Sequence, residues 1–224
     1  MAAITQAPDA AGLMDRMYRH QRHFYDATRK FYLLGRDELI AGLDPPPHAK
    51  VLEIGCGTGR NLVCAARHWP SIRGYGVDVS TEMLATARRA IAHARLDARI
   101  AVAQADATRL DPEALFGVGK FDRIFISYAL SMIPQWKDVL ARACECLEPG
   151  GAMHIVDFGD QADLPAAFRV GLARWLALFS VHPRLSLESD LAQFSADHGM
   201  RCRFNARFRR YAFLAVMESG GTTR

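Results

Sequence analysis

The 224-residue chain has the composition of a globular protein, with 50% hydrophobic and 23% charged residues. This composition excludes a wholly disordered chain, and the length suffices for a core that needs no disulfide bonds. Five scattered cysteines favour a reduced, cytoplasmic protein. Residues 1–12 lack the basic and apolar regions of a secretory signal, and two arginines interrupt the longest apolar stretch, 164–181, so we expect no membrane-spanning helix.

The net charge of +4 is unevenly distributed along the chain. Residues 16–36 hold six Arg or Lys and one Asp, and residues 201–210 hold five Arg and no acid. Two basic segments on an otherwise acidic chain indicate an anionic partner or surface. A solvated face together with a protected sheet edge would explain the same charges equally well.

Strands and helices alternate along most of the chain. Residues 13–41 have the periodicity of a helix that breaks or bends near Gly35, and the prolines of 42–47 end it. Ser80 or Thr81 is the expected N-cap of a later helix. We expect strands at 51–55, 74–79, 100–106, within 121–130 and at 152–160, and helices at 59–68, 80–96, 135–147, 164–181 and 187–198. This alternation predicts βαβ units and a parallel sheet.

The end of the chain follows a different pattern. In 201–209, arginines alternate with smaller or apolar residues, which is typical of a half-buried strand, and an apolar run follows at 211–219. Adjacent strands without an intervening helix pair antiparallel. We therefore predict an α/β fold with a mostly parallel sheet of seven strands and one antiparallel strand at or near its edge. We divide the chain into an N-terminal helical extension, 1–47, and a main domain, 48–220.

The strongest local feature is a glycine-rich turn, Gly55 to Gly59, between a strand and a helix. Glycines let a ligand approach the backbone, and the following helix offers unpaired N–H groups. Arg60 stands where the dinucleotide fingerprint has glycine, which disfavours a pyrophosphate ligand. Asp78 follows the second strand, where a carboxylate can accept from ribose hydroxyls, and Asp106 could accept from an adenine amino group.

The segments VLEIGCGTGR, GVDVS, AQADATRL, FDRIFIS and LEPGG, in this order over residues 50–160, resemble the class I S-adenosylmethionine-dependent methyltransferases. The resemblance implies a Rossmann-like fold with S-adenosylmethionine as cofactor, S-adenosylhomocysteine as product and no metal. It implies that Glu53 orients the loop at the methionine end and that Ser127 lies beside the cofactor. The cofactor-binding residues are then Tyr32, Glu53, Gly55, Cys56, Gly57, Asp78, Val79, Asp106, Ala107 and Ser127.

The methyl acceptor is constrained by what the sequence lacks. Methyl transfer from a sulfonium needs a positioned neutral nucleophile and a dry site. The eight histidines show no spacing that pairs them as metal ligands. The residues 127–130, Ser-Tyr-Ala-Leu, differ from the acidic or Asn residue, two prolines and aromatic of the DNA amino-methyltransferases, which disfavours nucleic acid as a substrate.

A stripe of tyrosines and arginines marks the N-terminal segment. Tyr18, Tyr25 and Tyr32 are seven residues apart, and so are Arg22, Arg29 and Arg36, which places all six on one side of a single helix. Arginine binds carboxylate or phosphate, and aromatic faces attract methylated ammonium. We expect this helix to cover the site as a lid. Tyr18, Tyr25 and Tyr128 would contact the amine as catalytic residues, and Arg22 and Arg29 would bind the substrate. A solvated amphipathic helix is the alternative.

Residues 14–40 also resemble the N-terminal region of bacterial betaine-lipid N-methyltransferases. This resemblance implies three successive methylations of diacylglyceryl-homoserine to diacylglyceryl-N,N,N-trimethylhomoserine. The lipid head group carries an amine and a carboxylate. The enzyme would then work in the cytoplasm, peripheral to the anionic inner face of the cytoplasmic membrane. A phosphatidylethanolamine N-methyltransferase, a small-amine methyltransferase and a non-catalytic cofactor-binding regulatory protein remain open.

Overall fold

The computed structural model describes residues 33–177, 183–184 and 186–219. Five of the expected site residues, all in the N-terminal stripe, lie outside the described residues: Tyr18, Arg22, Tyr25, Arg29 and Tyr32. Their roles stay predictions.

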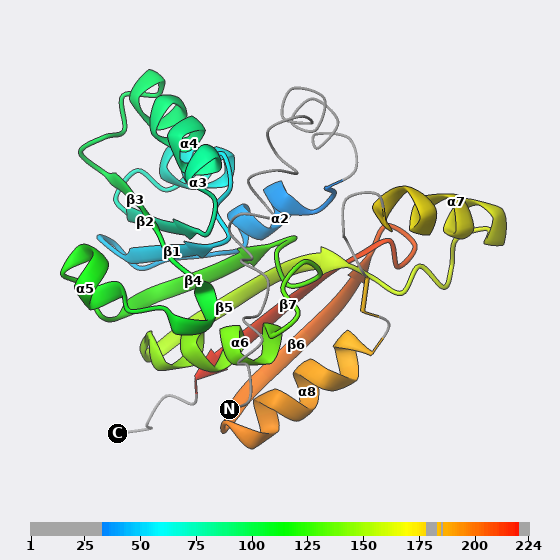
Figure 1. The fold of residues 1–224 in the computed structure, drawn as a ribbon. Coiled ribbons are helices and arrows are strands. Elements are labelled where there is room, and N and C mark those ends of the chain that lie inside the picture. The colour runs from blue at the N-terminus through cyan, green and yellow to red at the C-terminus, as the bar shows by residue number, and fades with distance from the viewer. Residues whose placement is uncertain (1–32, 178–182, 185, 220–224) are drawn as a thin grey trace, which may run out of the picture.

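The core of the molecule is a seven-stranded sheet in the order β3-β2-β1-β4-β5-β7-β6 (Figure 1). The strands are β1 (Lys50–Ile54), β2 (Arg73–Asp78), β3 (Ile100–Gln104), β4 (Phe121–Ser127), β5 (Leu147–Phe158), β6 (Met200–Arg207) and β7 (Ala212–Ser219). The first five strands pair in parallel, and β7 pairs antiparallel with both β5 and β6. The predicted mixed sheet with its antiparallel strand near one edge is confirmed.

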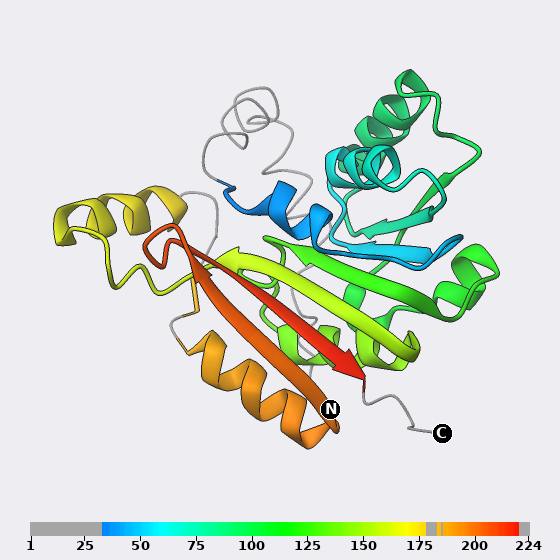
Figure 2. The same ribbon diagram turned by 180° about the vertical axis from the view of Figure 1, so that it is seen from behind.

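Helices cover both faces of this sheet (Figures 1 and 2). The helices are α2 (Arg36–Ala41), α3 (Arg60–His68), α4 (Thr81–His93), α5 (Pro112–Phe116), α6 (Trp136–Glu145), α7 (Ala166–Ala177) and α8 (Leu187–Asp197), with a 3-10 turn η1 (Ala107–Arg109). Alternate strand residues pack in opposite directions: Val51 joins the core under α2, α3 and α4, whereas Leu52 and Ile54 join the core under α6 and α8. These two cores make the three layers of an α/β fold.

The helix boundaries follow the local chemistry of the sequence. Ser80 is the N-cap of α4, and its hydroxyl accepts from the Met83 N–H at 3.3 Å, as predicted. The short helix α5 and the turn η1 were not expected. Both begin at aspartates whose side chains accept backbone N–H groups, Asp111 and Asp106. Strand β5 begins at Leu147, earlier than predicted, and its pairing with β4 has a register shift near Phe121.

The expectation that six Tyr and Arg residues share one helix is wrong at its last member. Gly35 has φ of 82°, residues 33–35 form a bend and a turn, and Arg36 begins the helix α2, so no single helix runs through residues 33–36. The Arg36 Nε donates instead to the Leu33 carbonyl at 3.1 Å. Leu39 and Ile40 of α2 are buried in the same core as β1. The described end of the 1–47 extension therefore contributes to the main domain's packing, while the boundary at residue 47 stays a prediction.

Candidate functional site

The glycine-rich loop lies where β1 ends and the order of the strands reverses between β1 and β4. In open α/β sheets, ligands bind at this kind of switch point, beside the carboxyl ends of the strands. Gly55, Gly57 and Gly59 all have left-handed backbone, with φ of 72°, 52° and 74°. A Cβ at Gly55 would lie 2.7 Å from the Ala129 Cβ, and a Cβ at Gly59 would lie 3.0 Å from the Ala87 Cβ. The loop therefore requires glycine both for its conformation and for its close packing.

Asp78 fixes the loop to the end of β2. Its Oδ2 accepts from the Gly57 N–H at 2.8 Å, and its Oδ1 accepts from the Ser80 N–H at 2.9 Å. The backbone N–H groups of Gly55 and Cys56 both donate to the Val77 carbonyl. The Cys56 side chain is buried and packs against Gly76, where a Cβ would lie 3.0 Å from the sulfur. Three of the expected cofactor residues, Gly55, Gly57 and Asp78, are thus in one hydrogen-bonded unit.

Glu53 is the buried acid of this unit. Its Oε1 accepts from the Asn61 Nδ2 at 2.9 Å, and its side chain is 1% exposed. Burial raises the pKa of the Glu53 carboxyl to about 8, although the Asn61 hydrogen bond lowers it. Sequence analysis did not identify Asn61. A polar residue in the first turn of a helix after a glycine loop, next to a strand with a buried acid, is the signal that could have found it.

The end of β4 completes the switch point from the other side. Ser127 is 9% exposed and Tyr128 has left-handed backbone, with φ of 56°. The Tyr128 N–H donates to the Val156 carbonyl at 2.8 Å, and its ring meets that of Phe158 edge to face at 4.7 Å between centroids. The left-handed residue turns the chain away from the sheet, so that Ala129 packs against Gly55. This brings the carboxyl ends of β1 and β4 into direct contact.

Tyr128 also ties the N-terminal part of the chain to this edge. Its hydroxyl donates to the Leu34 carbonyl at 2.6 Å, and burial raises the pKa of that hydroxyl well above its usual range. Gly35 lies close to Val156, since a Cβ there would be 3.2 Å from its Cγ2. Sequence analysis gave Tyr128 a role at the methylated amine. The structure places its hydroxyl on the backbone through which the chain enters the domain.

The expected adenine side of the site lies at the ends of β2 and β3. The Asp106 Oδ1 accepts from the Thr108 N–H and hydroxyl at 2.9 and 2.8 Å, so this exposed carboxylate has a fixed orientation. The Val79 carbonyl accepts from the Gln104 side chain at 3.0 Å, which joins the two strand ends. Ala107, the first residue of η1, is half-buried beside Asp106.

These residues fit a nucleoside cofactor that carries a positive charge. The Glu53 Oε2 and the Ser127 Oγ are buried and have no hydrogen-bond partner among the described residues. Buried polar atoms without partners are rare and call for an explanation, which a ligand between β1 and β4 would supply. The carboxylates of Asp78, the last residue of β2, and Asp106, just after β3, give this edge an acidic character that suits a cationic ligand.

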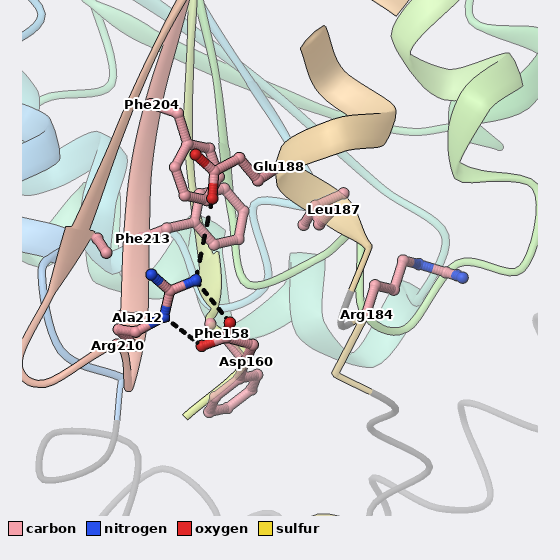
Figure 3. A pocket seen from close by; sticks show the side chains of 11 residues that line it. Phe158, Asp160, Arg184, Leu187, Glu188, Phe204, Arg210, Ala212 and Phe213 are labelled. Carbon is pink, nitrogen blue, oxygen red and sulfur yellow. Dashed lines mark hydrogen bonds and ion pairs between the residues drawn. The ribbon is translucent and has the colours of Figure 1, made fainter. Parts of the chain in front are cut away.

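A small cavity lies at the antiparallel end of the sheet (Figure 3). The Arg210 guanidinium binds both oxygens of Asp160 at 2.6 and 2.7 Å and lies 3.9 Å from Glu188. Arg184, on its rim, points away from it and donates to the Ile133 carbonyl at 2.8 Å (Figure 3). The cavity volume of about 20 Å³ suits a single water, so a substrate is not bound here.

The basic segment 201–210 is largely used within the protein. Arg203 binds Glu218 at 2.8 Å, Arg207 binds Glu38 at 2.7 Å and Arg210 binds Asp160. These arginines lie on or next to β6, the edge strand, where charged side chains block pairing with other chains. This supports the simpler interpretation of this segment, a protected sheet edge.

Within the described ranges, no group of three His, Cys, Asp or Glu residues could hold a metal ion. None of the helices in the same ranges is long and apolar enough to cross a membrane.

Comparison with known proteins is consistent with this site. Residues 51–151 match the family model described as a methyltransferase domain. Among curated relatives, the trans-aconitate 2-methyltransferase of Azoarcus sp. strain BH72 is 30% identical over 118 residues, which cover 53% of this chain and 42% of that protein. The demethylmenaquinone methyltransferase of Porphyromonas gingivalis is 26% identical over 159 residues, 68% of this chain and 63% of that one. The chain thus spans less than two thirds of the length of these relatives.

Solved structures show the same fold at low identity. One is the Haemonchus contortus phospholethanolamine N-methyltransferase 2 in complex with phosphomonomethylethanolamine and S-adenosylhomocysteine. It aligns with a TM-score of 0.72 at 16% identity, covering 96% of this chain and 61% of that one. The chain therefore shares the Rossmann-like fold of these methyltransferases, and residues 51–151 are similar to a methyltransferase domain.

Proposed function

We propose that this protein is an S-adenosylmethionine-dependent N-methyltransferase that converts diacylglyceryl-homoserine to diacylglyceryl-N,N,N-trimethylhomoserine. The observation that carries the cofactor half of the proposal is the unit at the switch point. It combines a left-handed glycine loop, Asp78 bound to that loop, and the two buried oxygens of Glu53 and Ser127. When bound, the cofactor supplies a methyl group that is already activated on a sulfonium.

The protein's own residues then position the reactants and exclude water. Asp78 would bind the ribose, Asp106 with the Ala107 N–H would bind the adenine, and Glu53 and Ser127 would face the methionine end. The amine must be neutral for each attack, and the first two transfers each release a proton. The Tyr128 hydroxyl donates to Leu34, and burial raises its pKa, so it is a poor proton acceptor. We therefore propose Tyr128 as a positioning residue.

The acceptor half of the proposal rests on the Tyr and Arg pattern of 18–32 and on the place where the chain enters the domain. The Leu34 carbonyl accepts a hydrogen bond from Tyr128, the neighbour of Ser127. The described end of the extension therefore lies at the edge that carries the candidate cofactor site. Tyr25 would stack on the methylated amine, and Arg22 or Arg29 would bind the head-group carboxylate. The partners would be this lipid and an anionic membrane surface, with the enzyme peripheral to it on the cytoplasmic side.

The test is methyl transfer from labelled cofactor to acceptors in detergent micelles. We expect turnover on diacylglyceryl-homoserine with mono-, di- and trimethylated products. Turnover on phosphatidylethanolamine instead would show that the enzyme recognises a phosphate rather than a carboxylate in the head group. Turnover only on trans-aconitate or a demethylated quinone would show that the acceptor is not an amine lipid. Cofactor binding without any turnover would favour a regulatory protein.

Variants of the tyrosines separate catalysis from positioning. Tyr25→Ala should lower kcat more than about tenfold, or about 1.4 kcal/mol of barrier, whereas Tyr25→Phe should retain more activity because the ring remains. Tyr128→Phe should raise the lipid KM more than it lowers kcat, because it releases Leu34 without touching the acceptor. Wild-type kinetics for Tyr25→Ala would indicate that the Tyr and Arg stripe is an ordinary solvated helix face.

A further inference from the structure

Helix α7 is exposed to an extent that its composition does not explain. Its sequence, AAFRVGLARWLA, is mostly apolar, yet only Leu176 is buried, and Phe168 and Val170 are 52% and 54% exposed. Across the described residues, four large hydrophobic side chains are exposed: Leu115, Phe168, Val170 and Phe208. Two of these four are on α7, which projects from the side of the molecule (Figures 1 and 2). An exposed apolar element of this kind marks an interaction site.

The distribution of apolar residues around α7 favours lipid over a protein groove. Phe168 and Val170 are two residues apart and so lie about 200° apart around the helix axis. Phe168 continues the side that Leu172 and Leu176 turn toward the body, and Val170 lies on the opposite side. A helix that docks in a protein groove presents one apolar stripe. On α7, Arg169 and Arg174 lie between the sides that carry Phe168 and Val170, so apolar side chains can enter lipid while the arginines reach its head groups. Twelve residues span about 18 Å, enough to enter one leaflet but not to cross a bilayer.

A second exposed aromatic lies next to α7, at the turn between β6 and β7. Phe208 is 46% exposed, and Phe208, Arg209 and Arg210 are three successive left-handed residues. This turn is anchored near the start of α7, because the Gln161 N–H donates to the Arg210 carbonyl and Arg210 binds Asp160. The Arg210 guanidinium donates to both oxygens of Asp160 and holds the pKa of that carboxyl below its usual value, so the turn is tied to the segment that precedes α7.

The charges on these two elements are of one sign. Helix α7 has Arg169 and Arg174 and no acid, and the turn adds Arg209. Neither Arg174 nor Arg209 has an ion pair with another described residue, unlike Arg203 and Arg207 on the sheet edge. Long arginine side chains can keep the guanidinium among lipid head groups while their stems lie in the apolar layer. This charge is complementary to an anionic membrane surface.

The position of these elements relates them to the candidate site. Strand β5 ends at Phe158, which pairs with Ala212 directly after the turn, so the turn lies at the carboxyl end of β5. The carboxyl ends of β1 and β4, with Glu53 and Ser127, are at the same edge of the sheet. A surface that contacted both α7 and the turn would therefore face the edge at which the acceptor must enter.

From this arrangement we infer that α7 and the β6–β7 turn form the membrane-docking face of the protein, with Phe168, Val170 and Phe208 inserting into an anionic phospholipid bilayer and Arg169, Arg174 and Arg209 binding its head groups. The inference deepens the proposed function and rests on it for the orientation of the site. It is more specific than an electrostatic attraction of the two basic segments to the membrane. It assigns the membrane contact to named side chains and assigns none to the ion-paired arginines of β6.

The test is flotation of the full chain with vesicles of phosphatidylcholine, with or without about one third phosphatidylglycerol. The double variant Phe168→Ser/Val170→Ser should bind the anionic vesicles about tenfold more weakly than the wild type, because two half-exposed apolar side chains are lost. The matched control is Leu115→Ser, which removes an exposed leucine of α5 on the opposite side of the molecule (Figure 1) and should bind as the wild type does. All three substituted positions are exposed, and equal thermal midpoints should verify that the variants fold.

Two further variants separate insertion from charge. Arg169→Gln/Arg174→Gln should remove most of the preference for anionic vesicles, about tenfold. Phe208→Asn should weaken binding about threefold. Asparagine tolerates the left-handed backbone at this position, so the turn is not disturbed. Wild-type binding by the Phe168→Ser/Val170→Ser variant would overturn the inference. A second result would also overturn it: a wild-type protein that is a dimer in solution, a variant that is a monomer, and no vesicle binding by either. The face would then bind a second copy of the chain.

Activity assays distinguish a failure of docking from a failure of the proposed function. With lipid acceptor in detergent micelles, Phe168→Ser/Val170→Ser should turn over as the wild type does, and with acceptor in anionic vesicles it should lose most of its rate. Equal rates in both forms would overturn docking and leave the function standing. Vesicle binding that depends on α7, without turnover on any amine lipid, would support docking and overturn the function.

Discussion

Two turns at the same edge of the sheet adopt left-handed backbone in different ways. The loop after β1 uses Gly55, Gly57 and Gly59, for which this conformation costs little. The turn between β6 and β7 uses Phe208, Arg209 and Arg210, each of which costs roughly 1–2 kcal/mol in this conformation. Glycine lets neighbouring atoms approach the first turn closely, whereas the second turn displays long side chains to solvent. The first turn leaves its backbone open to close approach, and the second presents side chains.

The largest expected effect is on the stability of the first turn. Gly55→Ala should lower the free energy of unfolding by roughly 2–5 kcal/mol, because the left-handed backbone and a 2.7 Å approach to the Ala129 Cβ both oppose a methyl group. Chemical denaturation measures it. The control is Gly117→Ala, at φ of 65° with open space around it, which should cost only about 1–2 kcal/mol. Equal losses for the two variants would show that close packing at Gly55 is unimportant.

The next effect concerns the hydrogen bonds that hold the loop to Asp78. Asp78→Asn replaces one accepting oxygen with a donor that faces a backbone N–H of Gly57 or Ser80. Binding of S-adenosylhomocysteine should weaken by about 2 kcal/mol, measured by calorimetry, because a charge-assisted hydrogen bond is lost. An unchanged affinity would remove Asp78 from the site.

The pH dependence of stability sharpens the comparison through Glu53. Its pKa is raised from 4.5 to about 8, so between these values the folded state binds more protons than the unfolded state. The free energy of unfolding should therefore fall with rising pH, by roughly 1 kcal/mol per pH unit. His154, whose pKa burial lowers from 6.5 to about 4, makes stability rise with pH between these values. Asp157, whose pKa burial raises from 3.8 to about 6, acts in the same direction as Glu53 but only below about pH 6. The clean window is pH 6.5–8, where Glu53→Gln should flatten the slope. Parallel curves for the wild type and this variant would contradict the raised pKa.

The smallest effect has the opposite sign and concerns the second turn. Arg209→Gly should raise the free energy of unfolding by about 0.5 kcal/mol, because glycine relieves the left-handed backbone but also gains freedom in the unfolded chain. A thermal melt of the two proteins measures this difference. A loss of stability would mean that the Arg209 side chain makes contacts that compensate for its backbone.

The sequence by itself determined the order of the elements and the position of the loop. Hydrophobic periodicity, the N-cap at Ser80 and the glycines of 55–59 are local signals, and these located the main strands and helices, although not the start of β5 or the short α5. The antiparallel end of the sheet also followed from local spacing, because no helix separates the last two strands. Gly35 predicts a break in the N-terminal helix, and this break separates Arg36 from the residues before it.

Only the tertiary structure decided which of these residues act together. The pKa of Glu53 depends on its burial in the assembled fold, and the Tyr128 hydroxyl reaches the Leu34 carbonyl across 94 positions of the chain. The ion pairs of the arginines near β6 join residues brought together by the insertion of β7 between β5 and β6. A charge pattern in a sequence cannot distinguish an arginine paired inside the fold from one that faces solvent, because pairing depends on long-range packing. The exposure of α7 is likewise a property of the assembled sheet, since the same apolar residues would be buried if another element covered them.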